Sequence, residues 1–167
     1  MLDAQRLVST QRPDAQLVFV GPDAGEFRER LRLTSYPGVH YLGEVDETEK
    51  ITAISSCALL CLPSTDEVFP TAIAEAWTLA RAVIGGPAHG LRELVEGHGG
   101  GVVAAQEAQS IAEAILRLLS DDALREAMGR RGQSVMSTTY SDRHFVMACV
   151  DAYEAAIRTA PTRNPQC

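Results

Sequence analysis

The chain has 167 residues, a net charge of −7 and a hydrophobic fraction of 46%. That length suits one domain, and that apolar fraction excludes a disordered chain. The acidic balance argues against a nucleic-acid-binding face, and no apolar run reaches the ~18 residues of a membrane helix. The N-terminal sequence also lacks an apolar signal core. We therefore expect one globular domain that works in the cytoplasm.

In chain order, short β-rich runs alternate with segments of helical spacing. Asp46 and Glu49 form a capping box at the start of one predicted helix. The run 58–62 is apolar on both faces, which is typical of a strand in the buried middle of a parallel sheet. The predicted strands are 16–20, 39–42, 58–62, 82–86 and 102–103, and the predicted helices are 3–11, 23–33, 47–55, 70–80, 89–96, 111–119, 121–136 and 142–158.

This alternation predicts βαβ units and therefore an α/β fold. We expect a doubly wound, mostly parallel sheet covered by helices over residues 1–159, followed by a mobile tail at 160–167. Sheets of this kind bind ligands beyond the carboxyl ends of their strands. Candidate site residues are therefore sought directly after each predicted strand.

Several common site types are excluded by the sequence. The glycines after the first predicted strand do not form G-x-G-x-x-G, and no G-x-x-x-x-G-K-[ST] loop occurs. A phosphate-sensing receiver-like domain, considered as a further class, lacks the acidic pair expected where Gly21-Pro22-Asp23 stands. The four cysteines have neither C-x2-C spacing nor a nearby histidine, so we expect reduced thiols and no metal site. Cys57 and Cys61 lie in an apolar run and are expected to act as small buried hydrophobic residues.

The segment after the third predicted strand reads PSTDEVFPTAIAEA, from Pro63 to Ala76. Pro70 suits the first position of a helix, so the amides of Thr71 and Ala72 are expected to be free donors. Free amides at a helix N-terminus form an anion site that suits a diphosphate. Glu75 lies further along in an apolar stretch, where a charge needs a partner or a ligand such as the paired hydroxyls of a ribose.

Other interpretations of these residues stay open. Glu67 and Glu75 are eight residues apart, and the glutamate content of the chain yields about one such pair by chance. Glu67 can be a solvated loop carboxylate, and Glu75 can lie on a solvated helix face. Trp77 is assigned to the core, with stacking against a nucleobase as the alternative.

At this segment the sequence resembles the C-terminal half of the family 4, or group 1, retaining glycosyltransferases with the GT-B fold. Their pattern there is roughly P-S-x-x-E-x-F-[GP]-x-x-x-x-E-A. The resemblance covers roughly residues 4–158 and includes further family patterns at 83–95 and 121–132. It implies one Rossmann-like half of a two-domain enzyme. That half binds a nucleoside diphosphate sugar, and UDP- or GDP-sugars are the expected donors.

The resemblance also implies residue roles. It implies no metal ion and no cofactor, and because it does not settle the mechanism we assign no catalytic residue. Glu93 matches a family position to which we assign no role, and a cap or ion pair within a short helix is the alternative. Carried over residue by residue, the resemblance implies that Glu67, Val68 and Phe69 contact the donor sugar. It likewise implies that Glu75 binds the ribose and that Thr71 and Ala72 bind the diphosphate.

The sequence departs from the family pattern in two ways. Ala80 and Ala82 stand where the family often has glycine and proline, so a different turn is expected there. The Arg and Lys-Gly that hold the donor phosphates, and the acceptor domain, have no counterpart; Arg6 and Arg12 are interpreted as surface charges. We therefore expect a truncated chain, a natural fragment or one subunit of a split enzyme, with little turnover alone. Its expected partners are a nucleotide sugar and the missing N-terminal domain. The expected location is the cytoplasm, with peripheral attachment of the full-length enzyme to a membrane as the alternative.

Two functions remain at this stage. The first is the donor-binding half of an enzyme that transfers a sugar to an acceptor hydroxyl with retention. The second is a non-enzymatic α/β module that binds a nucleotide or supports a partner. Removal of an acceptor domain would uncover apolar surface, so we also expect self-association through the exposed face.

Overall fold

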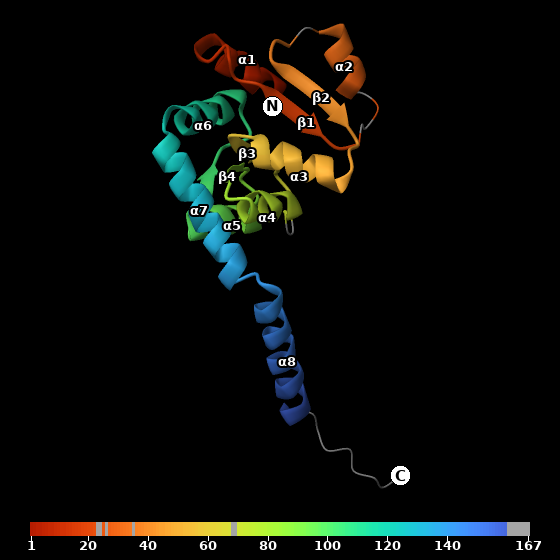
Figure 1. Ribbon diagram of the computed structural model, residues 1–167, viewed down its shortest axis with the longest axis vertical. Helices are drawn as coiled ribbons and strands as arrows, with labels where there is room; N and C mark the ends of the chain where they lie inside the picture. The colour runs from red at the N-terminus through yellow and green to blue at the C-terminus, as the bar shows by residue number, and fades with distance from the viewer. Residues whose placement is uncertain (23–24, 26, 35, 68–69, 160–167) are drawn as a thin grey trace.

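The computed structural model describes residues 1–22, 25, 27–34, 36–67 and 70–159, and the tail predicted at 160–167 lies outside them. Helices and strands alternate along the described chain, as expected (Figure 1). Their ends differ from the sequence prediction by a few residues. In chain order the elements are α1 (Leu2–Gln11), β1 (Leu17–Val20), α2 (Phe27–Leu33), β2 (Val39–Gly43), α3 (Glu47–Ser56), β3 (Leu59–Leu62), α4 (Thr71–Thr78), β4 (Ala82–Gly85), α5 (His89–His98), β5 (Gly101–Val103), α6 (Ala108–Ser120), α7 (Asp122–Thr138) and α8 (Asp142–Thr159).

The strands form two parallel sheets. β1 pairs with β2, and β3, β4 and β5 form the other sheet in that order. The α/β fold with parallel strands and flanking helices is thereby confirmed. The expected place of β3 in the middle of a sheet is wrong: β3 lies at the edge and is only partly buried, whereas β4 is central and buried throughout. The side chains of β3 are therefore more apolar than their partial burial in this arrangement requires.

Both faces of β4 contribute to the core. Because side chains alternate along a strand, Ala82 and Ile84 point to one face and Val83 to the other. The first face packs against buried residues of α1 and α6, such as Val8, and the second against buried residues of α4 and α5, such as Trp77. The larger buried side chains are Trp77, Ile73, Ile84, Leu91, Leu118, Val8, Val83 and Val95.

Trp77 is the largest side chain of this core. It is 0% exposed, and its indole Nε1 donates a hydrogen bond to the Gly100 carbonyl at 3.0 Å. A Cβ at either Gly100 or Gly132 would overlap the indole ring, so both glycines permit the close approach of β5 and α7. The predicted core role is confirmed, and stacking on a nucleobase is excluded because none of the side chain reaches solvent.

The turn after α4 differs from the sequence prediction. Ala80 has φ +54°, in the left-handed region. Its N–H donates to the Trp77 carbonyl at 2.9 Å, and the Arg81 N–H donates to the Ala76 carbonyl at 2.8 Å. These two bonds form a Schellman motif, which usually has glycine at the position of Ala80. The expectation of a different turn was wrong: alanine adopts the conformation of the glycine, at a cost of roughly 1–2 kcal/mol.

Ala80→Gly should therefore stabilise the domain. We expect a gain of about 1 kcal/mol in the free energy of unfolding, because glycine reaches positive φ without steric cost but loses more entropy on folding. For a chain of this size the melting temperature would rise by roughly 2–4 °C in calorimetry. Ala82→Gly, within β4, is the control and should lower stability. A less stable Ala80→Gly protein would contradict the strain inferred at this turn.

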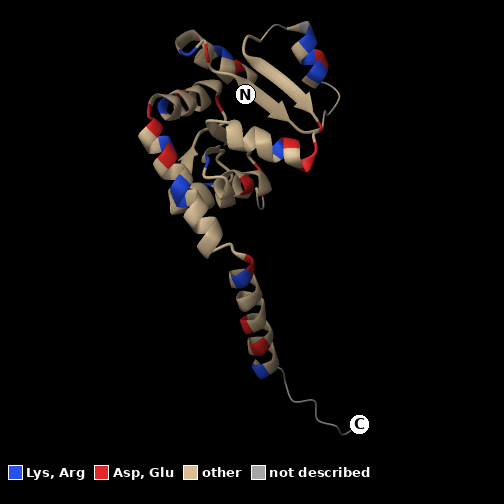
Figure 2. Ribbon diagram, viewed as in Figure 1, with Lys and Arg blue, Asp and Glu red and all other residues tan. Residues whose placement is uncertain are grey.

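The last helix, α8, extends away from the rest of the chain (Figure 1) and contains no buried residue. Acidic and basic residues are interspersed along α7 and α8 (Figure 2). Exposed apolar side chains occur along α8 between these charges, among them Phe145, Val150, Tyr153 and Ile157. In the described part of the chain, no helix has both the length and the apolarity needed to cross a bilayer.

Candidate functional site

The candidate site lies beyond the carboxyl end of β3, where the chain runs from Pro63 through Glu67 towards α4. The Ser64 N–H turns back to the Leu62 carbonyl, at 2.9 Å. Gly86, just after β4, lies so close to this loop that a Cβ would overlap the backbone of Pro63 and Ser64. The side-chain amide of Gln106, after β5, donates to the Pro63 carbonyl. Segments that follow three neighbouring parallel strands thus fix the start of the loop.

Helix α4 begins one residue later than the sequence indicated. Pro70 is the N-cap rather than the first helical residue, and its carbonyl accepts from the amides of Ile73 and Ala74 at 2.9 and 3.2 Å. The amides of Thr71 and Ala72 precede these first bonds of the helix. A helix N-terminus carries roughly half a positive charge, so these amides form a favourable position for an anion.

Glu67 lies in the loop ahead of Pro70 and is partly buried. Val68 and Phe69, which the resemblance assigns to the donor sugar together with Glu67, lie outside the described residues. The role of these three residues stays a prediction.

Glu75 lies one turn into α4 and has a charged partner. Its Oε1 lies 2.8 Å from Nζ of Lys50 on α3, and the same Nζ lies 2.9 Å from Oε2 of Glu47. The pKa of Lys50 is raised, mainly by its hydrogen bond to Glu75 and to a smaller extent by its hydrogen bond to Glu47. The ion pair with Lys50 therefore compensates the negative charge of Glu75 in this otherwise apolar stretch. The pairing of Lys50 with Glu47 could have been predicted, because the two residues are three apart in a predicted helix. The contact between Lys50 and Glu75 has no such signal in the sequence.

Thr71 and Glu75 share one face of α4, because residues four apart in a helix lie one above the other. The described residues also form a shallow groove of about 270 Å³ between α3 and α4. It includes Glu75 but neither Glu67 nor Thr71, and it is smaller than the ~300–1,000 Å³ of typical small-molecule pockets. The groove is lined by Glu47, Lys50, Ile51, Ile54, Ala74, Glu75, Thr78 and Leu79.

The remaining candidates have local roles. Glu93 lies 3.1 Å from His89, four residues earlier on α5, and both side chains are exposed. Desolvation raises the pKa of the Cys61 thiol to about 12 and also raises that of Cys57, although both residues are only partly buried rather than buried as expected. Among the described residues, no three His, Cys, Asp or Glu side chains gather as a metal ion would require.

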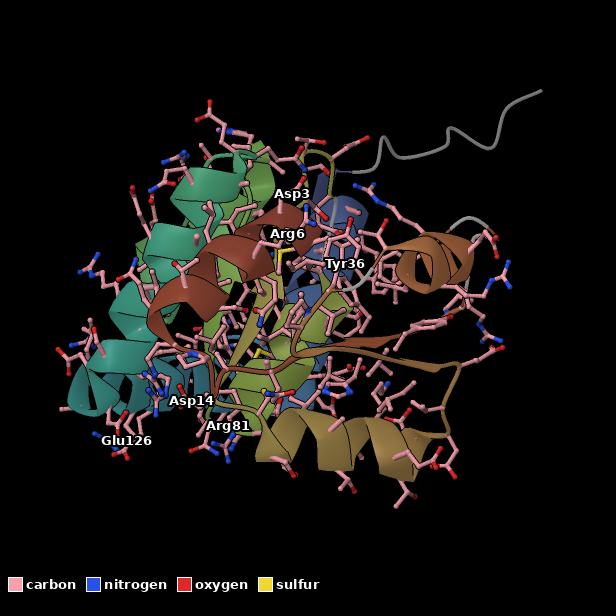
Figure 3. The ribbon with its side chains drawn as sticks, turned by 90° about the horizontal axis from the view of Figure 1, so that it is seen from above. Asp3, Arg6, Asp14, Tyr36, Arg81 and Glu126 are labelled. Carbon is pink, nitrogen blue, oxygen red and sulfur yellow. The ribbon has the colours of Figure 1, made fainter. Side chains whose placement is uncertain are left out.

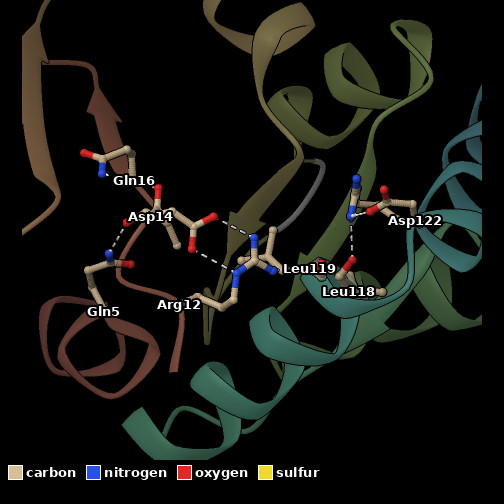
Figure 4. Close-up of polar contacts among 9 residues, drawn as sticks. Gln5, Arg12, Asp14, Gln16, Leu118, Leu119 and Asp122 are labelled. Carbon is tan, nitrogen blue, oxygen red and sulfur yellow. Dashed lines mark hydrogen bonds and ion pairs between the residues drawn. The ribbon is translucent and has the colours of Figure 1, made fainter. Parts of the chain in front are cut away.

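The two arginines near the N-terminus make contacts within the fold. Arg12 pairs with Asp14 at 2.8 Å and donates to the Leu119 carbonyl at 3.1 Å, which ties the chain after α1 to the end of α6 (Figure 4). Its hydrogen bond lowers the pKa of Asp14. Arg6 lies over the ring of Tyr36, with its guanidinium carbon 5.0 Å from the ring centre (Figure 3).

Comparison with known proteins decides the family. The family described as glycosyl transferases group 1 matches residues 1–135. This chain belongs to that family. It is 30% identical over 144 residues to a phosphatidyl-myo-inositol mannosyltransferase of Mycobacterium tuberculosis, covering 81% of this chain and 38% of that protein. It is 26% identical over 151 residues to a GDP-mannose-dependent monoacylated alpha-(1-6)-phosphatidylinositol monomannoside mannosyltransferase of Corynebacterium glutamicum, covering 84% and 39% respectively.

A solved structure supports the fold. The structure of Anabaena Alr3699/HepE in complex with UDP superimposes with a TM-score of 0.78 at 20% identity, covering 92% of this chain and 44% of that one. At this identity the likeness concerns the fold alone. The chain thus spans about two fifths of the length of the proteins that it matches.

Proposed function

We propose that this chain is the donor-binding, C-terminal half of a glycosyltransferase. The whole enzyme would move a sugar from a nucleoside diphosphate sugar to an acceptor hydroxyl with retention of configuration. The observation that carries the proposal is the start of α4 beyond the carboxyl end of β3, with Glu75 one turn along the same helix face as Thr71. Membership of the group 1 family gives this geometry its chemical context.

In this proposal the donor diphosphate lies against the amides of Thr71 and Ala72. Negative charge develops on the departing diphosphate during transfer, and fixed amide donors at a helix N-terminus stabilise such charge. Glu75 accepts hydrogen bonds from the two ribose hydroxyls, held in position by Lys50 at 2.8 Å. Glu67, with the backbone of Val68 and Phe69, lines the donor sugar.

The acceptor is recognised by the rest of the enzyme. A chain that spans about two fifths of its relatives leaves room for an N-terminal domain in the whole protein. We place the reaction in the cytoplasm, because Cys57 and Cys61 are free thiols and such thiols persist in reducing compartments. The chain alone would turn over little, since the cleft between two domains is incomplete.

For the nucleotide we propose GDP. The Corynebacterium relative is described as GDP-mannose-dependent, whereas the Anabaena structure holds UDP. The relative is the more similar of the two, at 26% against 20% identity. A GDP-sugar is therefore the proposed donor, and UDP is the alternative to be tested beside it.

Thermal unfolding in the presence of GDP, UDP, ADP or inorganic pyrophosphate tests this proposal. A ligand at ~100 times its dissociation constant stabilises the folded state by about 2.7 kcal/mol, which the melting temperature reports. We expect a shift with GDP that exceeds those with UDP and ADP. Equal shifts with GDP and pyrophosphate would indicate an anion site without nucleoside recognition.

The non-enzymatic module remains the second candidate, because the Lys50–Glu75 pair satisfies Glu75 without a ligand. The absence of any shift with all four compounds would favour it. A shift with UDP alone would keep the transferase half and change its donor.

A further inference from the structure

We propose that α8 pairs with the α8 of a second copy of this chain, as two antiparallel helices joined through their apolar faces. Helix α8 extends away from the rest of the chain, so two copies can approach along it without contact between their sheets (Figure 1). The pairing involves residues of α8 alone and therefore does not depend on the nucleotide proposal.

One face of α8 is apolar along the length of the helix and is left largely uncovered by the rest of the described chain. Residues three or four apart in a helix share a face. Phe145, Tyr153 and Ile157 are 69%, 72% and 75% exposed, and no residue of α8 is buried. A contiguous apolar surface of this kind marks an interaction site. This apolar face consists of Phe145, Val146, Cys149, Val150, Tyr153, Ala156 and Ile157.

Two opposite charges lie along one edge of the apolar face. Arg143, Val150 and Glu154 follow one another at spacings of seven and four residues, so they lie in one line along the helix. Arg143 and Glu154 are thereby separated by about 16 Å along the helix axis. Glu154 pairs with Arg158 at 3.3 Å, whereas Arg143 forms no ion pair within the described residues. The edge thus offers a cation near one end and an anion near the other.

This arrangement of charges favours an antiparallel pair. In two antiparallel helices related by a two-fold axis, the same edge of each helix meets its counterpart. Arg143 of one copy then lies level with Glu154 of the second copy, and the reverse pair forms at the other end. In a parallel pair, opposite edges meet instead. The second edge of the apolar face carries only the uncharged Ala148, Ala152 and Thr159.

The charge of α8 favours a second copy over a lipid surface. Helices that lie on membranes carry many Lys and Arg residues on their polar face. Helix α8 has two arginines against the carboxylates of Asp142, Asp151 and Glu154, and both signs are interspersed along it (Figure 2). A second copy, in contrast, supplies an apolar face of the same length together with both complementary charges.

The size of the apolar face sets the expected strength of the dimer. Two aromatic and three aliphatic side chains of this face belong to residues that are each at least 48% exposed. They offer on the order of 500 Å² per helix, since a buried aromatic side chain covers ~150–250 Å². A standard interface buries ~800 Å² per partner. We therefore expect a weak dimer that forms in the micromolar range and dissociates on dilution.

Sedimentation velocity of the full chain over a range of concentrations tests the proposal. We expect a monomer–dimer equilibrium that Val150→Asp weakens by about a hundredfold or more, because the new carboxylate would be buried between the joined faces. Ala155→Asp, on the opposite face of the same helix, is the matched control and should leave the dissociation constant unchanged. Neither residue is buried, so both variants should keep the melting temperature of the parent.

Charge reversal tests the antiparallel arrangement. Arg143→Glu and Glu154→Arg each place like charges at both ends of the antiparallel pair, so each variant alone should dimerise about tenfold more weakly than the parent. An equimolar mixture of the two variants restores opposite charges at both ends, so its affinity should return to that of the parent. In a parallel pair, each variant alone would dimerise as the parent does.

Every other outcome would overturn the proposal. A chain that stays monomeric at all concentrations would mean that another part of the whole enzyme, or another partner, covers the face. A monomer that floats with vesicles of phosphatidylcholine and phosphatidylglycerol would mean that a lipid surface covers it. Dimers that persist in Val150→Asp would lie on another surface, and dimers that tolerate both charge reversals would not be antiparallel. Because no nucleotide is present, these results are separable from those on donor binding.

Discussion

Gly129→Ala is expected to lower the free energy of unfolding by about 3 kcal/mol, a large fraction of the ~5–15 kcal/mol of a typical domain. Gly129 lies in α7 against the turn that follows α4. A Cβ at this position would overlap the carbonyl group of Ala80 and lie 3.3 Å from the amide nitrogen of Ala82. These are backbone atoms, so relief requires movement of a whole helix rather than rotation of a side chain. Urea unfolding followed by circular dichroism measures the loss.

Gly97→Ala is the matched control. Gly97 lies near the end of α5, and no atom lies within 4 Å of a Cβ built there. Alanine is the better helix former, so this variant should be more stable than the parent by roughly 0.5–1 kcal/mol. If Gly129→Ala were as stable as Gly97→Ala, the close packing of α7 against the Ala80 turn would be refuted.

The elements could be predicted from the sequence because their signals are local. The capping box is one example: Asp46 accepts from the Glu49 amide at 2.8 Å, and the Asp46 amide donates to the Glu49 carboxylate at 3.1 Å. The place of β3 was mispredicted for a physical reason. An apolar pattern reports what a strand is suited to bury, whereas burial depends on which neighbours are present.

The details of close packing lie beyond sequence patterns. At Ala80 the residue type argued against a left-handed turn, yet hydrogen bonds from two successive amides hold the turn in that conformation. The contacts of Gly129 and Gly132 with the region of α4 join residues about fifty positions apart. Nothing in the local sequence distinguishes these glycines from the exposed Gly97.

The candidate site was predictable in part. The positions of Thr71 and Ala72 at the start of α4 follow from the proline before them, although Pro70 itself lies one position outside the helix. The partner of Glu75 was not predictable, because Lys50 is 25 residues away and approaches only when α3 packs beside α4. The proximity of Glu67 to the same site stays a prediction.

Glu75→Gln is expected to weaken GDP binding by about tenfold or more, with little change in stability. A carboxylate that accepts hydrogen bonds from two hydroxyls is a stronger acceptor than an amide, whose nitrogen cannot accept at all. The ion pair that is lost is about one third exposed at both partners, and such pairs contribute little to folding. Isothermal titration calorimetry measures the affinity, and thermal unfolding without ligand measures the stability.

Two further variants separate a ligand contact from a structural role. Lys50→Met keeps the Glu75 carboxylate but releases it, so we expect a loss of GDP affinity of a few fold, smaller than that of Glu75→Gln. Glu126→Gln removes an exposed glutamate that pairs with Arg130 on α7, and it should leave the affinity unchanged. If Glu75→Gln bound GDP as the parent does, the assignment of the ribose to Glu75 would be wrong.

The pH dependence of binding gives an independent check on the Lys50–Glu75 pair. Both neighbouring carboxylates raise the pKa of Lys50 above its ordinary value of 10.5. Lys50 therefore keeps its charge throughout the neutral range and loses it only as the pH rises through that raised value. The contribution of this pair to GDP affinity should accordingly be constant between about pH 6 and 9. A loss of affinity within that range that Lys50→Met abolished would show that Lys50 titrates lower, and that the pair does not hold Glu75 as the structure describes.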